Sequence, residues 1–207
     1  MKSNYARCLD EVLRHEGGKV DHPKDPGGRT AYGVTQSTYD AWRKKQGLTA
    51  RDVFNIDRGE IEVIYRNEYW NKVKGDGIPL GVDLAVFDFA VNSGVSRSSK
   101  YTQALVGVVQ DGVIGLQTLA GINAYKGKLN LDLCDRRMSF LKGLSTWPTF
   151  GKGWTNRVNS VRDVSEKMRK EQTPPHVDQP TEFERQLLAA LEDKAVQDRI
   201  RAIVGAA

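Results

Sequence analysis

Residues 15–33, HEGGKVDHPKDPGGRTAYG, decide the fold of this chain. Apolar residues at helical spacing precede this stretch and predict an amphipathic helix: Tyr5, Leu9, Val12 and Leu13. Gly17 and Gly18 then supply the left-handed backbone that closes a helix. Glu16 is therefore expected in the last turn, where unpaired carbonyl groups and apolar neighbours favour the neutral carboxylic acid over the carboxylate.

A second carboxylate, Asp25, follows Glu16 within the turn-forming run at residues 25–28. A neutral acid that protonates a leaving oxygen and a second carboxylate that activates water are the two groups that hydrolyse glycosidic bonds. Thr30 adds a hydroxyl that can orient the water or the aspartate. The alternatives are an ordinary solvated Glu16 and an Asp25 that only caps its turn. Residues 32–35 predict a short β segment, so a small hairpin or loop should wall one side of a cleft.

The pattern Glu-Gly-Gly-x4-Pro-x-Asp-Pro-Gly-Gly-x-Thr-x2-Gly-Val-Thr begins at Glu16 and resembles the N-terminal motif of glycoside hydrolase family 108. Further segments are similar, in the same order, to motifs of that family and of its adjoining predicted peptidoglycan domain. They lie at residues 64–70, 86–94, 111–118 and 150–157. Several motifs in one order are far more specific than any single motif.

The family comprises phage endolysins and bacterial muramidases with a lysozyme-like fold. The resemblance implies a peptidoglycan hydrolase that cleaves the β-1,4 bond between N-acetylmuramic acid and N-acetylglucosamine. It also implies that Glu16 is the general acid, that Asp25 positions or deprotonates the attacking water, and that Thr30 assists. The sequence departs from the pattern in two places. Thr30 lies one residue nearer to the aspartate than in the phage lysozymes, and Lys19 stands where the family usually has an aromatic residue.

Four further side chains are candidates for contact with the sugar: Tyr32, Tyr69, Trp70 and Asn92. Tyr69 and Trp70 end an amphipathic helix, and such an aromatic pair is also a common core feature. Asn92 shares a helix face with Asp88, and a structural role is the alternative for both.

Most of the chain is predicted as helix, over residues 38–46, 57–71, 82–92, 100–108, 116–124, 130–144 and 156–170. The expected fold class is mainly α and lysozyme-like, with a short β-hairpin or loop near Glu16 and a C-terminal helical extension. The expected domains are a catalytic domain over 1–171, a Pro-rich linker over 172–180 and an amphipathic helix over 181–207. Within the first, a catalytic region at 5–75 packs with a peptidoglycan-domain region at 76–170.

The formal net charge is +5 at pH 7, and a basic protein associates faster with an acidic polymer such as a bacterial wall. Basic and aromatic residues do not interleave as they do in nucleic-acid readers. No apolar run of membrane-spanning length and no signal peptide are evident. The chain is therefore expected to be made in a host cytoplasm and to act on peptidoglycan in the periplasm or cell wall. A phage holin pore would supply its route, and the C-terminal helix could self-associate.

Two other functions are compatible with parts of the sequence. His15 and His22 could share a zinc ion with Asp21 or Asp25, which would suit a peptidoglycan peptidase, but no His-Glu-x-x-His motif is present. The turn at residues 111–118 could instead serve a non-catalytic wall-binding or secretion-associated protein. No cofactor or metal is implied by the preferred interpretation.

Overall fold

The computed structural model describes residues 4–21 and 28–172 of the chain. Asp25, the Pro-rich linker beyond Gln172 and the C-terminal helix expected over 181–207 lie outside the described residues. The helices are α1 (Tyr5–His15), α2 (Gln36–Lys45), α3 (Arg58–Tyr65), α4 (Val82–Ser93), α5 (Val95–Val106), α6 (Leu116–Ala124), α7 (Leu129–Lys142) and α8 (Trp147–Gln172). Three short helical turns join them, η1 (Val53–Asn55), η2 (Arg66–Trp70) and η3 (Gly75–Gly77).

Helix α1 follows the predicted pattern closely. Tyr5, Leu9 and Val12 are buried on one face, and the helix ends at His15. Glu16 is the first residue past the helix, with extended backbone and its N–H donated to the carbonyl of Val12. The glutamate thus lies at the carboxyl end of a helix that is anchored in the core.

Three two-residue strands follow, β1 (Lys19–Val20), β2 (Thr30–Ala31) and β3 (Val34–Thr35), which pair in antiparallel order. The sequence places a β segment over residues 32–35, but Tyr32 and Gly33 form the turn between β2 and β3. Both have positive φ, 51° and 75°, as a type I′ hairpin turn requires. The expected hairpin is therefore present, and its tip falls at Tyr32 and Gly33.

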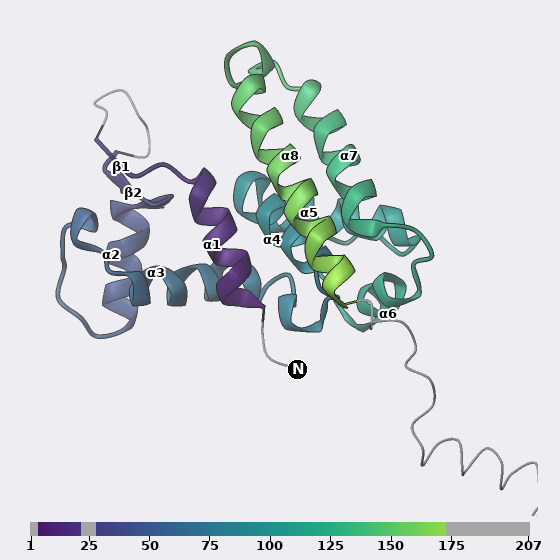
Figure 1. Ribbon diagram of the computed structural model, residues 1–207. Coiled ribbons are helices and arrows are strands. Elements are labelled where there is room, and N and C mark those ends of the chain that lie inside the picture. Colours follow the sequence, from purple (N-terminus) through teal and green to yellow (C-terminus); the bar gives the residue numbers. More distant parts are fainter. Residues whose placement is uncertain (1–3, 22–27, 173–207) are drawn as a thin grey trace, which may run out of the picture. The chain divides into compact units, whose positions relative to one another are not determined.

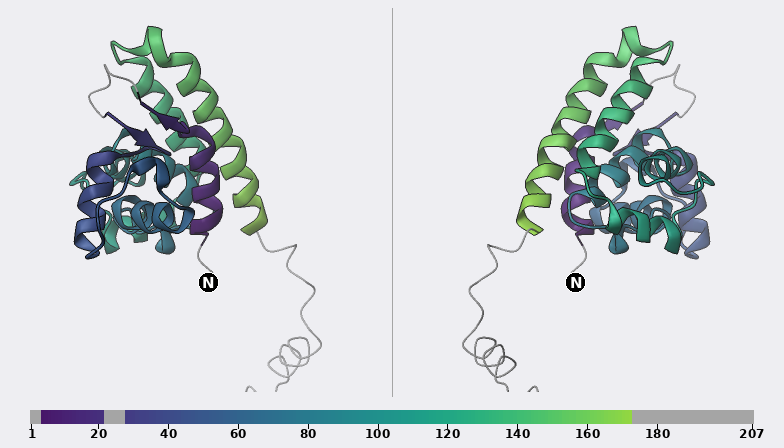
Figure 2. Two further views of the ribbon diagram at one scale, coloured as in Figure 1. Left: turned by 90° about the vertical axis from the view of Figure 1, so that its left-hand side faces the viewer. Right: turned by 90° about the vertical axis from the view of Figure 1, so that its right-hand side faces the viewer.

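Figure 1 shows the sheet and α2 on one side of the C-terminal end of α1, and the antiparallel pair α7 and α8 on the other. The first turns of α8 extend past the end of α1, which both views of Figure 2 also show. Helix α4 packs behind α1 and is buried on almost all sides, in keeping with its continuous apolar sequence. The end of α1 is thus where the hairpin and the C-terminal helices meet.

Three helices differ from their predicted bounds by more than two residues. A single π turn, η2, interrupts the helix expected over 57–71, and Asn71 donates to the carbonyl of Arg66 there. Helix α5 begins at Val95, directly after Gly94 at φ 95°, and not near residue 100. Helix α8 begins at Trp147, two turns before the predicted start. Within the described residues, no helix is long and apolar enough to cross a membrane.

Candidate active site

Glu16 is held in place by an arginine that lies 141 positions further along the chain. Arg157 of α8 donates from Nη1 to Oε1 of Glu16 at 2.7 Å. Only 18% of the glutamate side chain is exposed, and 8% of the arginine side chain. The contact joins the end of α1 to α8 and fixes one carboxylate oxygen of Glu16.

Arg157 is itself bound to Asp88, which α4 carries into the core with no exposed surface. Its Nε donates to both carboxylate oxygens at 3.0 and 3.1 Å, and its Nη2 donates to Oδ1 at 2.8 Å. Arg137 of α7 donates from Nη1 to Oδ2 of Asp88 at 2.5 Å. Two arginines and two carboxylates therefore form one buried chain of ion pairs that ends at Glu16.

The charges of Glu16, Arg157, Asp88 and Arg137 stabilise one another. Burial would raise the pKa of Asp88, but Arg137 and Arg157 outweigh it and hold that pKa below its usual value. Burial would likewise lower the pKa of Arg157, but Asp88 and then Glu16 raise it above its usual value. Arg157 is therefore a permanent cation beside Glu16, and most of its hydrogen bonds go to Asp88.

The hairpin tip covers the other side of Glu16. A Cβ atom at Gly33 would lie 2.9 Å from Oε2 of Glu16 and 2.5 Å from the hydroxyl of Tyr65, so only glycine fits there. The Tyr65 hydroxyl donates to the carbonyl of Tyr32 at 2.8 Å and fastens the tip to α3. Gly33 thus brings the hairpin backbone into contact with the carboxyl group.

The charge of Glu16 raises the pKa of two neighbouring tyrosines. Burial raises the pKa of Tyr65, and Glu16 raises it further. Burial also raises the pKa of Tyr69, with smaller contributions from Glu16 and Glu68. Their rings lie 5.5 Å apart between centroids, and both belong to the wall formed by α3 and η2. Because Tyr65 is buried and Tyr69 half-buried, Tyr69 is the one with surface available for a ligand.

The two oxygens of Glu16 have different surroundings, and this difference bears on chemistry. Oε1 accepts the arginine hydrogen bond, so it cannot also carry a proton that faces Arg157. Oε2 faces the hairpin tip, where a Cβ atom at Gly33 would lie 2.9 Å from it. The carboxyl group of Glu16 is therefore held in one orientation, by Arg157 at one oxygen and by the hairpin tip at the other.

The other candidates predicted from the sequence are placed as follows. Thr30 lies in β2 and donates from its hydroxyl to the carbonyl of Gly28 at 3.2 Å. Tyr32 is 37% exposed at the hairpin tip. Asn92 is half-buried near the end of α4 and accepts from the hydroxyl of Ser93 at 2.9 Å. Asp25 lies outside the described residues.

Trp70 requires a correction. The sequence offers it as a sugar contact, but the structure buries it completely. Its ring packs against Tyr5 and Phe87, and its Nε1 donates to Oδ1 of Asp76 at 2.8 Å. A ring with no exposed surface cannot stack on a sugar, so Trp70 belongs to the core.

The zinc alternative gains no support from the described residues. No group of three or more His, Cys, Asp or Glu side chains in residues 4–21 and 28–172 could hold a metal ion. His15 lies with its Nε2 3.5 Å from Oε1 of Glu11 on its own helix. His22, the other ligand in that proposal, lies outside this part of the chain.

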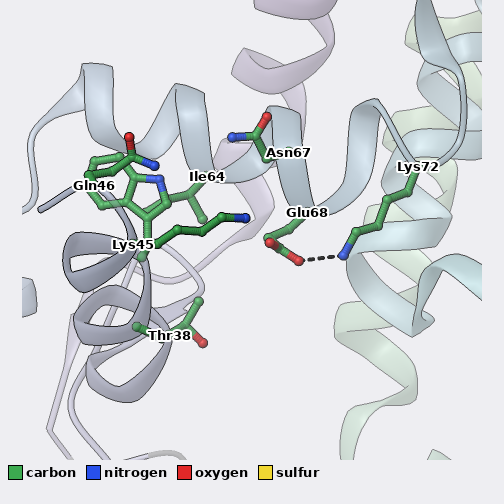
Figure 3. Close-up of a pocket in the computed structure, with 9 residues that line it drawn as sticks. Thr38, Lys45, Gln46, Ile64, Asn67, Glu68 and Lys72 are labelled. Atoms are coloured by element: carbon green, nitrogen blue, oxygen red, sulfur yellow. Dashed lines mark hydrogen bonds and ion pairs between the residues drawn. The ribbon is translucent and has the colours of Figure 1, made fainter.

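A groove of about 750 Å³ lies between α2 and the helical segment of α3 and η2, and none of the predicted site residues lines it. In Figure 3, Lys45 extends along it toward Glu68, which pairs with Lys72 at 2.6 Å. The residues that line this α2 groove are Thr38, Ala41, Trp42, Lys45, Gln46, Ile64, Asn67, Glu68 and Lys72. It is a surface feature separate from Glu16, and it supplies control positions for the experiments below.

The sequence interpretation gave Arg157 no role of its own and gave Asp88 no link to Glu16. Arg157 lies in the segment at 150–157 that was matched to a family motif, and it interrupts the inward face that Val158 and Val161 continue. The signal available in the sequence was the charged side chain of Arg157 among positions that face the core. Its partner could not be read from spacing, because the pair spans 141 positions.

Comparison with known proteins identifies the family of this chain. A sequence model of the family described as Glycosyl hydrolase 108 matches residues 9–94. The solved structure of SagA from Brucella abortus is similar at 45% sequence identity with a TM-score of 0.71, and the match covers 82% of this chain and 97% of SagA. No curated protein sequence matches the chain. The chain therefore belongs to the glycosyl hydrolase 108 family, and the mainly helical, lysozyme-like fold expected from its sequence is confirmed.

Proposed function

We propose that this chain, a lysozyme-like peptidoglycan hydrolase by family, cleaves the β-1,4 bond between N-acetylmuramic acid and N-acetylglucosamine. The observation that carries the proposal is the setting of Glu16, with one oxygen held by Arg157 and the other turned toward the hairpin tip. This arrangement supports a general acid at Glu16, because Arg157 and the hairpin tip fix the position and direction of its carboxyl group.

In the proposed mechanism, Oε2 of Glu16 protonates the glycosidic oxygen as positive charge develops on the sugar ring. Asp25, the second carboxylate of the motif, orients or deprotonates the attacking water, and Thr30 assists it. Tyr32, Tyr69 and Asn92 contact the sugars on either side of the bond. Inversion at the anomeric carbon is the outcome that similarity to phage lysozymes favours.

The bond that is cut can be identified by digestion of purified peptidoglycan, borohydride reduction and mass spectrometry of the soluble fragments. We expect fragments that end in reduced N-acetylmuramic acid. Fragments that end in reduced N-acetylglucosamine would contradict the proposed bond. Cut peptide stems that disappear with a chelator would point to the zinc peptidase, and binding without soluble products would point to the non-catalytic alternative.

We also propose that the enzyme works in phage lysis, reaching the periplasm or cell wall from the host cytoplasm through a holin-type pore. Expression in a bacterial cytoplasm with and without a holin tests this: lysis should require the holin, and prompt lysis without it would refute the route. Self-association through residues 181–207 is a further proposal. Sedimentation of the full chain against residues 1–180 tests it, since only the full chain should form oligomers.

A further inference from the structure

Aromatic side chains follow one face of the first turns of α8. Trp147, Phe150 and Trp154 are three and four positions apart, which places them along one side of a helix. Their rings form a continuous series, with centroids 6.2 Å apart for Trp147 and Trp154 and 5.6 Å apart for Phe150 and Trp154. We call these three residues the α8 aromatic stripe.

The stripe is continuous with the candidate active site. Phe150 precedes Arg157 by seven residues, which is about two helical turns, so both side chains leave α8 in nearly the same direction. The rise between them is about 10 Å, at about 1.5 Å per residue. Because Arg157 bonds Glu16, the stripe begins beside the catalytic centre and leads outward along the part of α8 that extends past α1 (Figure 1).

Exposure distinguishes Phe150 from an ordinary core residue. Its side chain is 52% exposed, whereas Trp147 and Trp154 are half-buried and pack against the core. Among the aromatic residues that the structure describes, only Phe150 and Tyr32 are classed as exposed. These two belong to the two elements that meet at Glu16, the hairpin tip and α8.

A glycine within the stripe leaves room for one of its rings. A Cβ atom at Gly151 would lie 2.7 Å from the indole of Trp147, so this glycine allows the ring to lie flat on the helix backbone. The rings are tilted by 41° between Trp147 and Trp154 and by 35° between Phe150 and Trp154. Aromatic side chains lose little entropy when a ligand binds, and an exposed ring offers the negative face of its π-system to C–H groups. The apolar faces of sugar rings carry such C–H groups, whereas their hydroxyls point outward.

We propose that the α8 aromatic stripe is a binding platform for the glycan strand of peptidoglycan, over which about a disaccharide stacks before it reaches Glu16. The inference rests on the proposed function, since it assigns part of the same substrate to a new surface. Phe150 is the central contact, and Trp154 and Trp147 support it. Tyr32, exposed at the hairpin tip, is the aromatic residue on the other element that meets Glu16.

The first test separates substrate binding from chemistry. We expect Phe150→Ala to raise KM on labelled peptidoglycan about tenfold, equivalent to about 1.4 kcal/mol, with kcat within about twofold of wild type. Phe150→Tyr and Phe150→Trp should restore KM, whereas Phe150→Leu should not. Leu116→Ala is the matched control, because Leu116 is 86% exposed on α6 and should change neither constant. An unchanged KM in Phe150→Ala, or full rescue by Phe150→Leu, would overturn the proposal.

The second test does not require turnover. Chitohexaose, a soluble N-acetylglucosamine hexamer, is titrated into the Glu16→Gln protein while tryptophan fluorescence is recorded. We expect a spectral change that is lost in Trp154→Phe and kept in Trp42→Phe, since Trp42 lines the α2 groove. Loss of the change in Trp42→Phe alone would place the glycan in the α2 groove and refute the proposal.

The two tests also separate this inference from the proposed function. Cleavage without any dependence on Phe150 would refute the platform alone. Binding of chitohexaose that depends on Phe150, in a wild type that cuts no glycosidic bond, would support the platform and refute the proposed function. Binding of phospholipid vesicles that depends on Phe150, with no glycan binding, would show a lipid-binding surface and overturn the inference.

Discussion

Asp88→Asn tests the buried chain of charges that positions Glu16. Asp88 has no exposed surface and accepts hydrogen bonds from both Arg137 and Arg157. The substitution keeps the shape of the side chain but removes its charge. It leaves two buried cations with Glu16 as their only anion, and it turns an amide N–H₂ toward guanidinium donors.

The expected loss of unfolding free energy is about 3–5 kcal/mol, the usual result of breaking a buried ion pair from one side. For a chain of this length this corresponds to a fall in Tm of about 6–20 °C. Urea denaturation followed by circular dichroism measures the free energy, and calorimetry measures Tm. Glu68→Gln is the control, because Glu68 and Lys72 form an exposed pair of i and i+4 residues. Its loss should stay below about 0.5 kcal/mol.

A double variant distinguishes charge from packing. Asp88→Asn combined with Arg137→Met removes one of the unpaired cations, so it should be more stable than Asp88→Asn alone. If the free energy of unfolding of Asp88→Asn lies within about 1 kcal/mol of wild type, the claim that these buried ion pairs organise the site is refuted.

Three further outcomes are expected. Gly33→Ala should fold but lose most activity, because its Cβ would meet Tyr65 and Glu16 at a positive φ; activity near wild type would show that the tip does not contact Glu16. Tyr32→Asn should raise stability by about 0.5–1 kcal/mol, since asparagine tolerates this φ better, and should weaken peptidoglycan binding; a lower Tm would contradict the turn assignment. Burial raises the pKa of Asp83 to about 6, from about 3.9 in the unfolded chain. Between pH 4 and 6 the unfolded chain therefore loses this proton while the folded protein keeps it, so stability should fall by about 3 kcal/mol as pH rises. Asp83→Asn should abolish that slope in pH-dependent denaturation, and an identical slope in both proteins would contradict the assignment.

The bounds of a helix could be predicted where the spacing of its apolar residues matches the face that the structure buries. Helix α1 ended within one residue of the place that its apolar spacing predicts. The expected left-handed backbone at Gly17 and Gly18 was wrong, because the extended backbone of Glu16 already ends the helix. Helix α8 began two turns earlier than expected, since Pro148, Gly151 and Gly153 suggest a loop. Proline is tolerated in the first turn of a helix, and Gly151 is retained for the packing of Trp147.

The site was predictable only where its residues are close in sequence. Glu16 at the end of α1 and the hairpin that follows it were both expected from one short motif. The positive φ of Tyr32 does not, because intrinsic preference favours asparagine or glycine there and a hydrogen bond from Tyr65 to its carbonyl holds the turn. Arg157 and Asp88 meet Glu16 only through tertiary folding, which no spacing rule encodes.

Glu16 acts as the general acid in the proposed mechanism, and the rate at which Glu16→Gln releases soluble fragments from labelled peptidoglycan measures this role. We expect a rate at least about a hundredfold below wild type, the range for loss of a general acid, in a protein whose Tm matches wild type. Glu68→Gln should keep the full rate. A folded Glu16→Gln protein that retains more than about a tenth of wild-type activity would contradict the claim.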